Sequence, residues 1–248
     1  MKIDIRFGQP TPYNYETIID HFSGTSYSTF RTSSIPLVQF WKDTETRLGK
    51  LFKVLNLDPR HTTLCFEYPT PPQKGKGKSS MTDLMVFAED IKVAIEAKFT
   101  EYTPNGSIKL IKHWGKKGNT ENKKLVLQYW KDLIGPFSYG MDDEALLNVE
   151  YQFFHRTASA CKDIKQAIVV YLVFYDEETK KHLGSFIKKL KNYITVINPK
   201  DNLKFYLWQV EVSQKVAKKK DTDNPFLIMK KREVYRIGSS NLGKISTN

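Results

Sequence analysis

The sequence is short of the residues that build disulfide frameworks and zinc sites. It contains five histidines and two cysteines, Cys65 and Cys161, which lie far apart. Neither cysteine belongs to a CxxC motif, and no cysteine–histidine cluster has the spacing of a zinc site. We therefore expect both thiols to be free and buried, as isolated cysteines usually are.

Long apolar runs and several catalytic signatures are also missing. No apolar run reaches the roughly 18 residues that cross a bilayer, and the N-terminus alternates polar and apolar residues like a strand, unlike a signal peptide. We therefore expect a cytoplasmic protein with no membrane segment. GxSxG and HExxH motifs are absent, and Pro72 stands where a Walker A motif ending near Gly77 needs glycine, which argues against nucleotide hydrolysis.

Acidic side chains are outnumbered by basic ones. The chain has 39 Lys and Arg residues against 27 Asp and Glu residues, a net charge of +12 with a pI near 9.4. A basic protein attracts polyanions, and nucleic acid is the commonest polyanion in the cytoplasm. With 248 residues, 40% of them hydrophobic, the chain can form one domain with a packed core.

Hydrophobic periodicity predicts an α/β fold, in which a mixed β-sheet is flanked by helices. We expect one domain spanning 1–248, with an N-terminal extension at residues 1–34 and a flexible tail at residues 239–248. The predicted helices are 36–56, 121–134, 142–162 and 182–193, and the predicted strands are 62–68, 82–88, 92–101, 166–175 and 203–212.

Two carboxylates and one lysine fall on neighbouring predicted strands. Glu96 and Lys98 alternate with apolar residues, so they share one face of their strand. If Glu89 and Asp90 form the hairpin turn, counting outward places Asp83 directly opposite Glu96, on the same face. Two facing carboxylates repel each other unless a cation lies between them, although an ordinary surface pair on an edge strand would also account for Glu96 and Lys98.

These residue types suit phosphodiester chemistry. Mg²⁺ prefers oxygen ligands and keeps several waters, so two carboxylates and a substrate phosphate suffice to hold it. The metal lowers the pKa of a bound water and neutralises charge on the phosphate. Lys98 can orient that water or stabilise the transition state. We do not expect it to act as the general base, because Asp83 and Glu96 favour its charged form.

The segments Thr82-Asp83 and Ile95-Glu96-Ala97-Lys98 resemble the motif of the PD-(D/E)XK nuclease superfamily, with Thr82 in place of the proline. The resemblance covers residues 36–176 and implies that they form the catalytic core, a restriction-endonuclease-like α-β-β-β-α-β arrangement. It implies that Asp83, Glu96 and the Ala97 carbonyl bind Mg²⁺, for which Mn²⁺ can substitute, and that Lys98 is the catalytic lysine.

A further acidic residue from the first helix often joins such sites. Glu45 is the first candidate, because it continues the apolar stripe of the predicted helix 36–56 and so points inward. Glu67, on the first strand of the meander, is the competitor. A Glu45 side chain that reaches from the edge of the stripe to water would also fit the pattern.

The predicted helix 142–162 carries a polar flank with Gln152, His155 and Arg156. This flank is either solvent-facing surface, or it faces the catalytic pocket and holds the DNA backbone, for which Arg156 is suited by its bidentate geometry. Superfamily members carry a glutamine on a helix here, so the resemblance adds Gln152 to the catalytic set.

Lys74, Lys76 and Lys78 alternate with glycines in the loop before Asp83, a composition that suits close approach to a phosphate but also suits a flexible, solvated connection. The sequence as a whole predicts a Mg²⁺-dependent DNA endonuclease of restriction or defence type. Such enzymes often pair to cut both strands, which makes a homodimer one expected arrangement. The alternatives are a nucleic-acid-binding protein that keeps this fold without cutting, and an interaction protein in which the charged pair is incidental.

Overall fold

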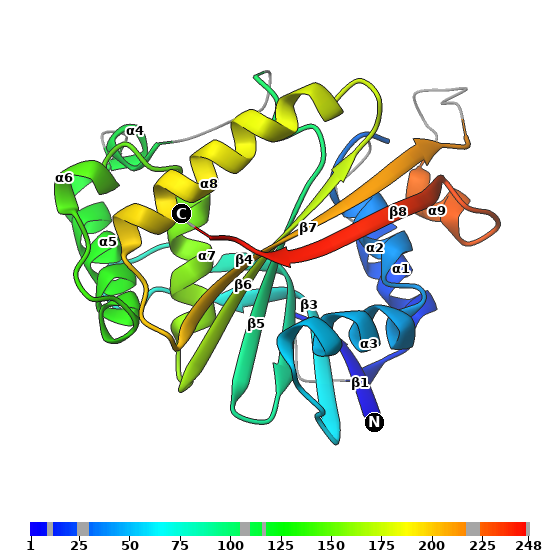
Figure 1. The fold of residues 1–248 in the computed structure, drawn as a ribbon, viewed down its shortest axis with the longest axis horizontal. Helices are drawn as coiled ribbons and strands as arrows, with labels where there is room; N and C mark the ends of the chain where they lie inside the picture. Colours follow the sequence, from blue (N-terminus) through cyan, green and yellow to red (C-terminus); the bar gives the residue numbers. More distant parts are fainter. Residues whose placement is uncertain (9–11, 24–29, 105–109, 116–117, 217–223, 247–248) are drawn as a thin grey trace.

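The strands of the computed structural model form one mixed sheet (Figure 1). The structure describes residues 1–8, 12–23, 30–104, 110–115, 118–216 and 224–246. The strands in these ranges are β1 (Lys2–Phe7), β2 (Pro12–Tyr13), β3 (His61–Thr70), β4 (Ser80–Ala88), β5 (Ile91–Lys98), β6 (Gln166–Tyr175), β7 (Leu203–Gln214) and β8 (Tyr235–Lys244). They lie in the order β2-β1-β3-β4-β5-β6-β7-β8. The meander β3-β4-β5 is antiparallel, whereas β5, β6 and β7 run parallel, so the predicted mixed sheet is confirmed.

Helices cover both faces of this sheet. They are α1 (Tyr15–Ser23), α2 (Ser34–Phe40), α3 (Thr44–Leu55), α4 (Ile111–Gly115), α5 (Thr120–Ile134), α6 (Asp143–Leu146), α7 (Tyr151–Cys161), α8 (Leu183–Ile197) and α9 (Pro225–Met229), with short 3₁₀ turns η1 (Gly135–Phe137) and η2 (Lys180–His182). The helices α1, α2, α3 and α9 lie on one side, and α5, α7 and α8 lie on the other (Figure 1).

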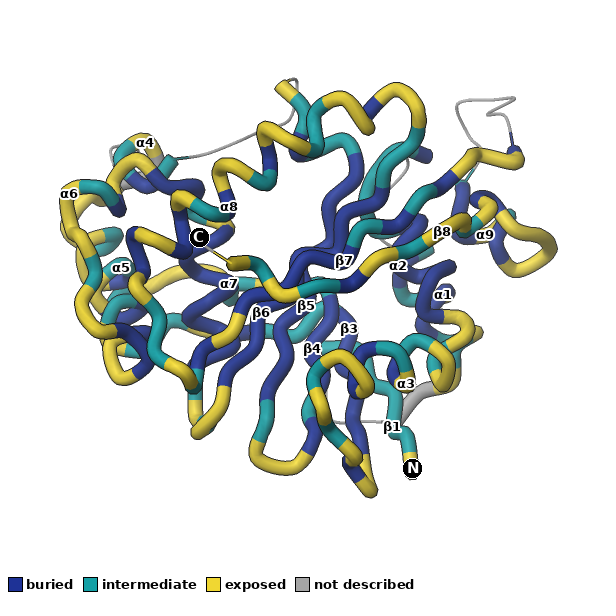
Figure 2. Tube along the Cα trace, in the orientation of Figure 1, coloured by how far each residue is buried: buried dark blue, intermediate teal, exposed yellow. Residues whose placement is uncertain are grey.

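The alternation of side chains along the strands divides the apolar core between these two faces. On β6, Val170 and Leu172 pack toward α2, whereas Val169 and Tyr171 pack toward α7, and all four are fully buried. This explains why the segment is apolar throughout, as predicted for a strand covered on both sides. Figure 2 shows the buried strands between helices whose outer surfaces are exposed.

The helix predicted for residues 36–56 is wrong as a single element, because it is divided into α2 and α3. The side chain of Thr44 donates a 2.6 Å hydrogen bond to the carbonyl of Trp41, and the backbone of Asp43 (φ −91°, ψ 61°) is not helical. The chain therefore turns between the two helices, and the second helix starts with a new orientation.

The helix predicted for residues 142–162 is also two helices, α6 and α7. The carbonyls of Leu147 and Val149 accept main-chain hydrogen bonds, both 3.0 Å, from Lys112 and Ile111. Since these carbonyls bond to another segment, they do not continue the helix. The predicted helix at 121–134 and the strand at 166–175 are confirmed within one residue.

Both ends of the chain differ from the prediction. The expected N-terminal extension contains β1, which pairs in parallel with β3 along its whole length. The expected flexible tail is wrong for residues 239–244, which belong to β8 and pair with β7. β8 is an edge strand of the described sheet, and its sequence lacks the apolar alternation that would have predicted a strand. Residues 247–248 lie outside the described ranges.

Cys65 and Cys161 are both free and buried, as predicted. In the described ranges, no helix combines the length and the apolar character that crossing a bilayer requires.

Candidate active site

The strands β4 and β5 part where the predicted carboxylates lie. Their ladder starts at Ala88 and Ile91, on either side of the predicted turn, and its last pair is Leu84 with Ile95. Beyond this pair β4 stays beside β3, and β5 stays beside β6. Asp83 and Glu96 are the next residues on the two strands, which confirms the predicted register up to this point.

The Asp83 carboxylate takes the place of a main-chain acceptor in this gap. Its Oδ2 accepts a 2.7 Å hydrogen bond from the N–H of Ala97 on β5. The strand separation frees this N–H from the sheet ladder, and an unpaired N–H inside the protein is costly. Asp83 is therefore held at the end of the ladder, where it bridges the two parting strands.

Glu96 and Lys98 form a buried ion pair beside Asp83. Their side chains are 2% and 5% exposed, and Lys98 Nζ lies 2.7 Å from Glu96 Oε1. The second carboxylate oxygen of Glu96 accepts from Nε of Arg156, whose side chain is also 5% exposed. Lys98 donates a further hydrogen bond of 2.8 Å to Oε1 of the exposed Gln152. The ordinary surface pair that the sequence left open is thus excluded.

Helix α7 supplies three of these neighbours from one face. Gln152, His155 and Arg156 are spaced at i, i+3 and i+4, so their side chains lie together. Arg156 donates to the carbonyl of Met81 and lies 3.4 Å from Oγ of Ser80, while His155 Nδ1 and Ser80 Oγ are 2.5 Å apart. The three helix residues therefore face the sheet, and the solvent-facing alternative applies only to part of Gln152.

Charge in the site is not balanced. Glu67 on β3 stands opposite Asp83, and its backbone has a φ of +48°, a left-handed conformation that non-glycine residues seldom adopt. Three carboxylates, those of Glu67, Asp83 and Glu96, thus lie near two permanent cations, those of Lys98 and Arg156. If every group is ionised, one negative charge remains without compensation.

The pKa values reflect this imbalance. Burial raises the pKa of Asp83 well above its ordinary value, and the charge of Glu96 raises it further. Burial also raises the pKa of Glu67, to about 7, although Arg156 opposes this shift. For Glu96 the effect of burial is outweighed by Arg156 and Lys98, which lower the pKa to about 2. Asp83 and Glu67 therefore hold a proton more readily than ordinary carboxyls do, whereas Glu96 stays ionised.

The two basic groups of the site differ in protonation. Burial alone would lower the pKa of Lys98, but Glu96 and Asp83 outweigh it and raise the value, so the amine stays charged. Burial, followed by the charge of Arg156, lowers the pKa of His155 well below its ordinary value, so this imidazole is neutral at pH 7. The predicted exclusion of Lys98 as a general base agrees with this electrostatic environment.

The donor atoms suit a hard cation, but their arrangement is not that of a formed metal site. Carboxylate oxygens with excess negative charge are the ligands that Mg²⁺ prefers. Across the described ranges, however, no three His, Cys, Asp or Glu side chains are grouped as metal ligands. Both oxygens of Glu96 are engaged by Lys98 and Arg156. Glu96 would therefore have to exchange one of these partners for the ion.

The prediction that Glu45 joins the site is wrong. Glu45 lies in the first turn of α3 and is exposed, and α3 packs on the opposite side of the sheet from α7. The helix break at Asp43 moves it away from the stripe that suggested an inward direction, and an acidic residue in a first helical turn is stabilised by the helix dipole. Glu67, the competitor, occupies the site.

A basic pocket of about 440 Å³ opens beside these residues. Lys76 and Lys78 line it from the loop before β4, Lys123 lines it from α5, and His155 and Arg156 line it from α7. Lys74 does not line this pocket, because it pairs with Asp132 at 2.5 Å. Two of the three predicted loop lysines therefore line a pocket that shares Arg156 with the carboxylate site.

In this loop, Gly75 is needed for packing against α5, whereas the sequence suggested that the glycines allow close approach to a phosphate. Gly75 has a φ of +78°, and a Cβ atom there would lie 2.8 Å from Cγ2 of Val126 and 2.9 Å from the carbonyl of Asn122. The side chain of Asn122 also binds the main chain of Lys76 in both directions, at 2.5 Å and 2.6 Å. Gly75 thus lets the loop dock on α5, whereas a Cβ at Gly77 would meet open space.

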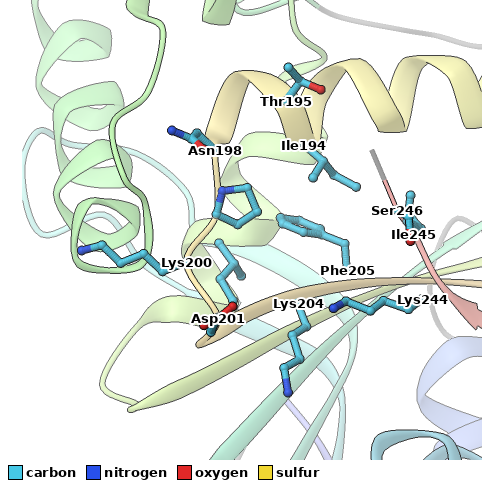
Figure 3. A pocket seen from close by; sticks show the side chains of 12 residues that line it. Ile194, Thr195, Asn198, Lys200, Asp201, Lys204, Phe205, Lys244, Ile245 and Ser246 are labelled. Carbon is cyan, nitrogen blue, oxygen red and sulfur yellow. The ribbon is translucent and has the colours of Figure 1, made fainter. Parts of the chain in front are cut away.

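A second pocket, of about 400 Å³, lies at the opposite end of the parallel strands (Figure 3). Its residues include Lys200, Lys204 and Phe205. The neighbouring Leu203 of β7 is in register with Ala167 of β6, which is in register with Lys92 of β5. Lys92 lies six residues before Lys98 on β5, so the pocket and the carboxylate site are separated by roughly 20 Å along the strands. It is therefore separate from the carboxylate site.

Sequence reasoning missed the role of Arg156 as the partner of Glu96, and it missed the polar contacts that hold α7 on β4. Ser159 Oγ lies 3.0 Å from Thr82 Oγ1, in the buried interface between these elements. The signal that was present in the sequence is the i, i+4 spacing of Gln152 and Arg156 on one helix face, since it brings both side chains to one site.

Comparison with known proteins identifies the family of this chain but no characterised relative. No curated protein and no solved structure matches the chain. Residues 20–215, most of the chain, match a protein family described as a domain of unknown function, DUF6946. The chain therefore belongs to the DUF6946 family.

Proposed function

We propose that this protein is a Mg²⁺-dependent nuclease that hydrolyses phosphodiester bonds in DNA. The observation that carries the proposal is the convergence of Asp83, Glu96 and Lys98 where β4 and β5 part, with Gln152 of α7 bound to Lys98. A basic pocket beside this group suits a nucleic acid chain. As a finer proposal, the segment α3-β3-β4-β5-α5-α7-β6 is a restriction-endonuclease-like core, because it repeats the predicted order of elements.

Asp83, Glu96 and the carbonyl of Ala97 are the groups proposed to hold the ion. When bound, Mg²⁺ polarises the phosphate and lowers the pKa of a water molecule. The negative charge left by three carboxylates and two cations supports cation uptake, and so does the raised pKa of Asp83. Arg156 is proposed to hold Glu96 in the absence of the ion.

Lys98 is proposed to act on the phosphate as a fixed positive charge. Glu96 and Asp83 keep its amine charged, and the hydrogen bond to Gln152 sets its direction. A charged donor that is already in place stabilises the extra negative charge of the transition state without reorganisation. His155, one helical turn from Gln152, has a pKa well below its ordinary value because it is buried beside Arg156, so we assign it no proton-accepting role.

A plasmid-nicking assay with Mg²⁺ tests this proposal. Wild type and the control variant Glu45→Ala, which changes an exposed glutamate on the other side of the sheet, are expected to nick supercoiled DNA at similar rates. Asp83→Asn, Glu96→Gln and Lys98→Ala are each expected to lose at least about a hundredfold, the usual effect of removing a charged catalytic group. Equal nicking by all five proteins would refute the proposal.

The second candidate function is nucleic-acid binding without cleavage. The observation that favours it is the engagement of both Glu96 oxygens by Lys98 and Arg156, which leaves that carboxylate no free oxygen for an ion. It predicts salt-sensitive DNA binding, no cleavage with Mg²⁺ or Mn²⁺, and DNA affinity that is unchanged in Glu96→Gln. The described residues mark no dimer face, so both candidates are stated for a single chain.

A further inference from the structure

The basic pocket differs sharply in charge from the carboxylate site next to it. Lys76, Lys78, Lys123 and Arg156 line it together with His155, and none of its described lining residues is an aspartate or a glutamate. Lys76 and Lys78 are exposed and make no ion pair within the described ranges. Arg156 is already paired with Glu96, so Lys76 and Lys78 are the cations that can attract an anionic ligand to this pocket.

Arg156 joins the two sites. Its Nε binds Glu96 and its Nη1 binds the carbonyl of Met81, but its Nη2 has no hydrogen-bond partner among the described residues. This guanidinium is 95% withdrawn from solvent, and it lines the pocket. A buried arginine with an unused donor is suited to a phosphate oxygen, which accepts strong charge-assisted hydrogen bonds.

Apolar and aromatic side chains also line the pocket. They are Val126 and Trp130 of α5, which are almost fully buried, and Tyr151 of α7, which is partly exposed. Trp130 Nε1 donates to the hydroxyl of Tyr151 at 3.1 Å, which fixes the two rings relative to each other. Aromatic side chains beside cationic ones are the usual means of binding single-stranded nucleic acid, because every base has a face that can stack.

The pocket is also held in its shape before any ligand arrives. The two hydrogen bonds between Asn122 and the main chain of Lys76 fix the loop on α5. Gly75 permits that contact, because a Cβ atom there would meet the helix. A preformed site loses less entropy on binding than a mobile loop does. Its volume of about 440 Å³ is within the range of small-ligand pockets.

From these contacts we propose that the pocket binds one nucleotide of the substrate strand, with its phosphate at Arg156 and Lys78 and its base against the partly exposed ring of Tyr151. This inference rests on the proposed function for the identity of the strand as DNA. It adds a subsite that holds a nucleotide beside the one whose phosphate is cleaved. Arg156 then couples the two positions, because the same guanidinium contacts Glu96 and the bound phosphate.

The test measures binding of a mononucleotide in the absence of metal. Isothermal titration calorimetry at low salt compares deoxyadenosine 5′-monophosphate, deoxyadenosine and inorganic phosphate on Asp83→Asn protein. Both parts of the nucleotide contribute in the proposal, so the monophosphate is expected to bind about tenfold more tightly than either fragment. No saturable binding of the monophosphate would overturn the inference, and so would equal affinity for phosphate alone.

Two loop variants provide a matched comparison. Lys78→Ala removes a pocket cation and is expected to weaken monophosphate binding about tenfold, the usual effect of losing one charge-assisted contact. Lys74→Ala removes the same charge from the same loop, but its side chain pairs with Asp132 outside the pocket, so binding is expected to stay within about twofold. Equal weakening by both variants would show general charge attraction and would overturn the pocket assignment.

The outcome is independent of whether the enzyme cuts. Mononucleotide binding without metal, in a variant that lacks the Asp83 carboxylate, does not require cleavage. If the monophosphate binds as expected while the plasmid stays intact, the proposed nuclease function fails and the subsite stands. If wild type cuts DNA but none of the three probes saturates, the nuclease function stands and the subsite is wrong.

Discussion

Replacement of Glu67 by glutamine should stabilise the protein in a pH-dependent way. Burial raises the pKa of this carboxyl to about 7, from an ordinary value of 4.5, against the opposing effect of Arg156. A carboxyl whose pKa is higher in the folded state disfavours folding when it is ionised. The destabilisation caused by ionised Glu67 is absent below about pH 4.5, where the carboxyl is protonated in both the folded and the unfolded state. It increases as the pH rises to about 7 and is constant above that.

The size of this cost follows from the pKa difference. A difference of about 2.5 between the folded and unfolded states corresponds to about 3 kcal/mol at most, since one pKa unit is worth about 1.4 kcal/mol. Asp83 and Glu96 share the same local field, so part of the cost passes to them when Glu67 is neutralised. We therefore expect Glu67→Gln to raise the free energy of unfolding by about 1–3 kcal/mol at pH 8.

Urea unfolding in EDTA at five pH values between 4.5 and 8.5 measures this effect. The gain in stability of Glu67→Gln over wild type should rise between pH 4.5 and 7 and then level off. Glu45→Gln is the control, because that glutamate is exposed on the other side of the sheet. A gain that is the same at every pH, or a loss at pH 8, would refute the charge imbalance deduced for the site.

Arg156→Ala should lower the free energy of unfolding by about 3–5 kcal/mol in urea titrations, because it leaves the buried Glu96 short of a partner; an effect below about 1 kcal/mol would contradict the buried pairing. Gly75→Ala should cost about 2 kcal/mol in the same assay, since its backbone has a left-handed φ and its Cβ would meet α5, whereas Gly77→Ala should have a smaller effect. Mn²⁺ should raise the melting temperature of wild type at pH 7.5 but not that of Asp83→Asn; an equal rise in both would place the ion elsewhere.

The elements that the sequence predicted well are those whose residues carry a local pattern. The Glu89-Asp90 turn and the alternation on either side of it fix the β4–β5 register, and that register brings Asp83 and Glu96 to the same point of the sheet. The uniformly apolar residues of β6 likewise predict a strand buried on both faces. In both cases the information lies within a few residues along the chain.

Other features depend on contacts between distant segments. Arg156 pairs with Glu96 across sixty residues. The helical spacing of Gln152 and Arg156 places both on one face of α7, but it does not identify Glu96 as the partner of Arg156. The position of Glu67 at the site depends on a left-handed backbone within a strand. The helical stripe that points Glu45 inward is interrupted by the break at Asp43. Such contacts follow from tertiary structure, which periodicity does not contain.

The most direct test of the central claim is a crystal structure of the protein soaked in Mn²⁺. We predict anomalous density for one ion within about 2.2 Å of carboxylate oxygens of both Asp83 and Glu96, with Arg156 or Lys98 displaced from one oxygen of Glu96. A structure with no ion at this place, in which Lys98 and Arg156 still hold both oxygens of Glu96, would contradict the claim.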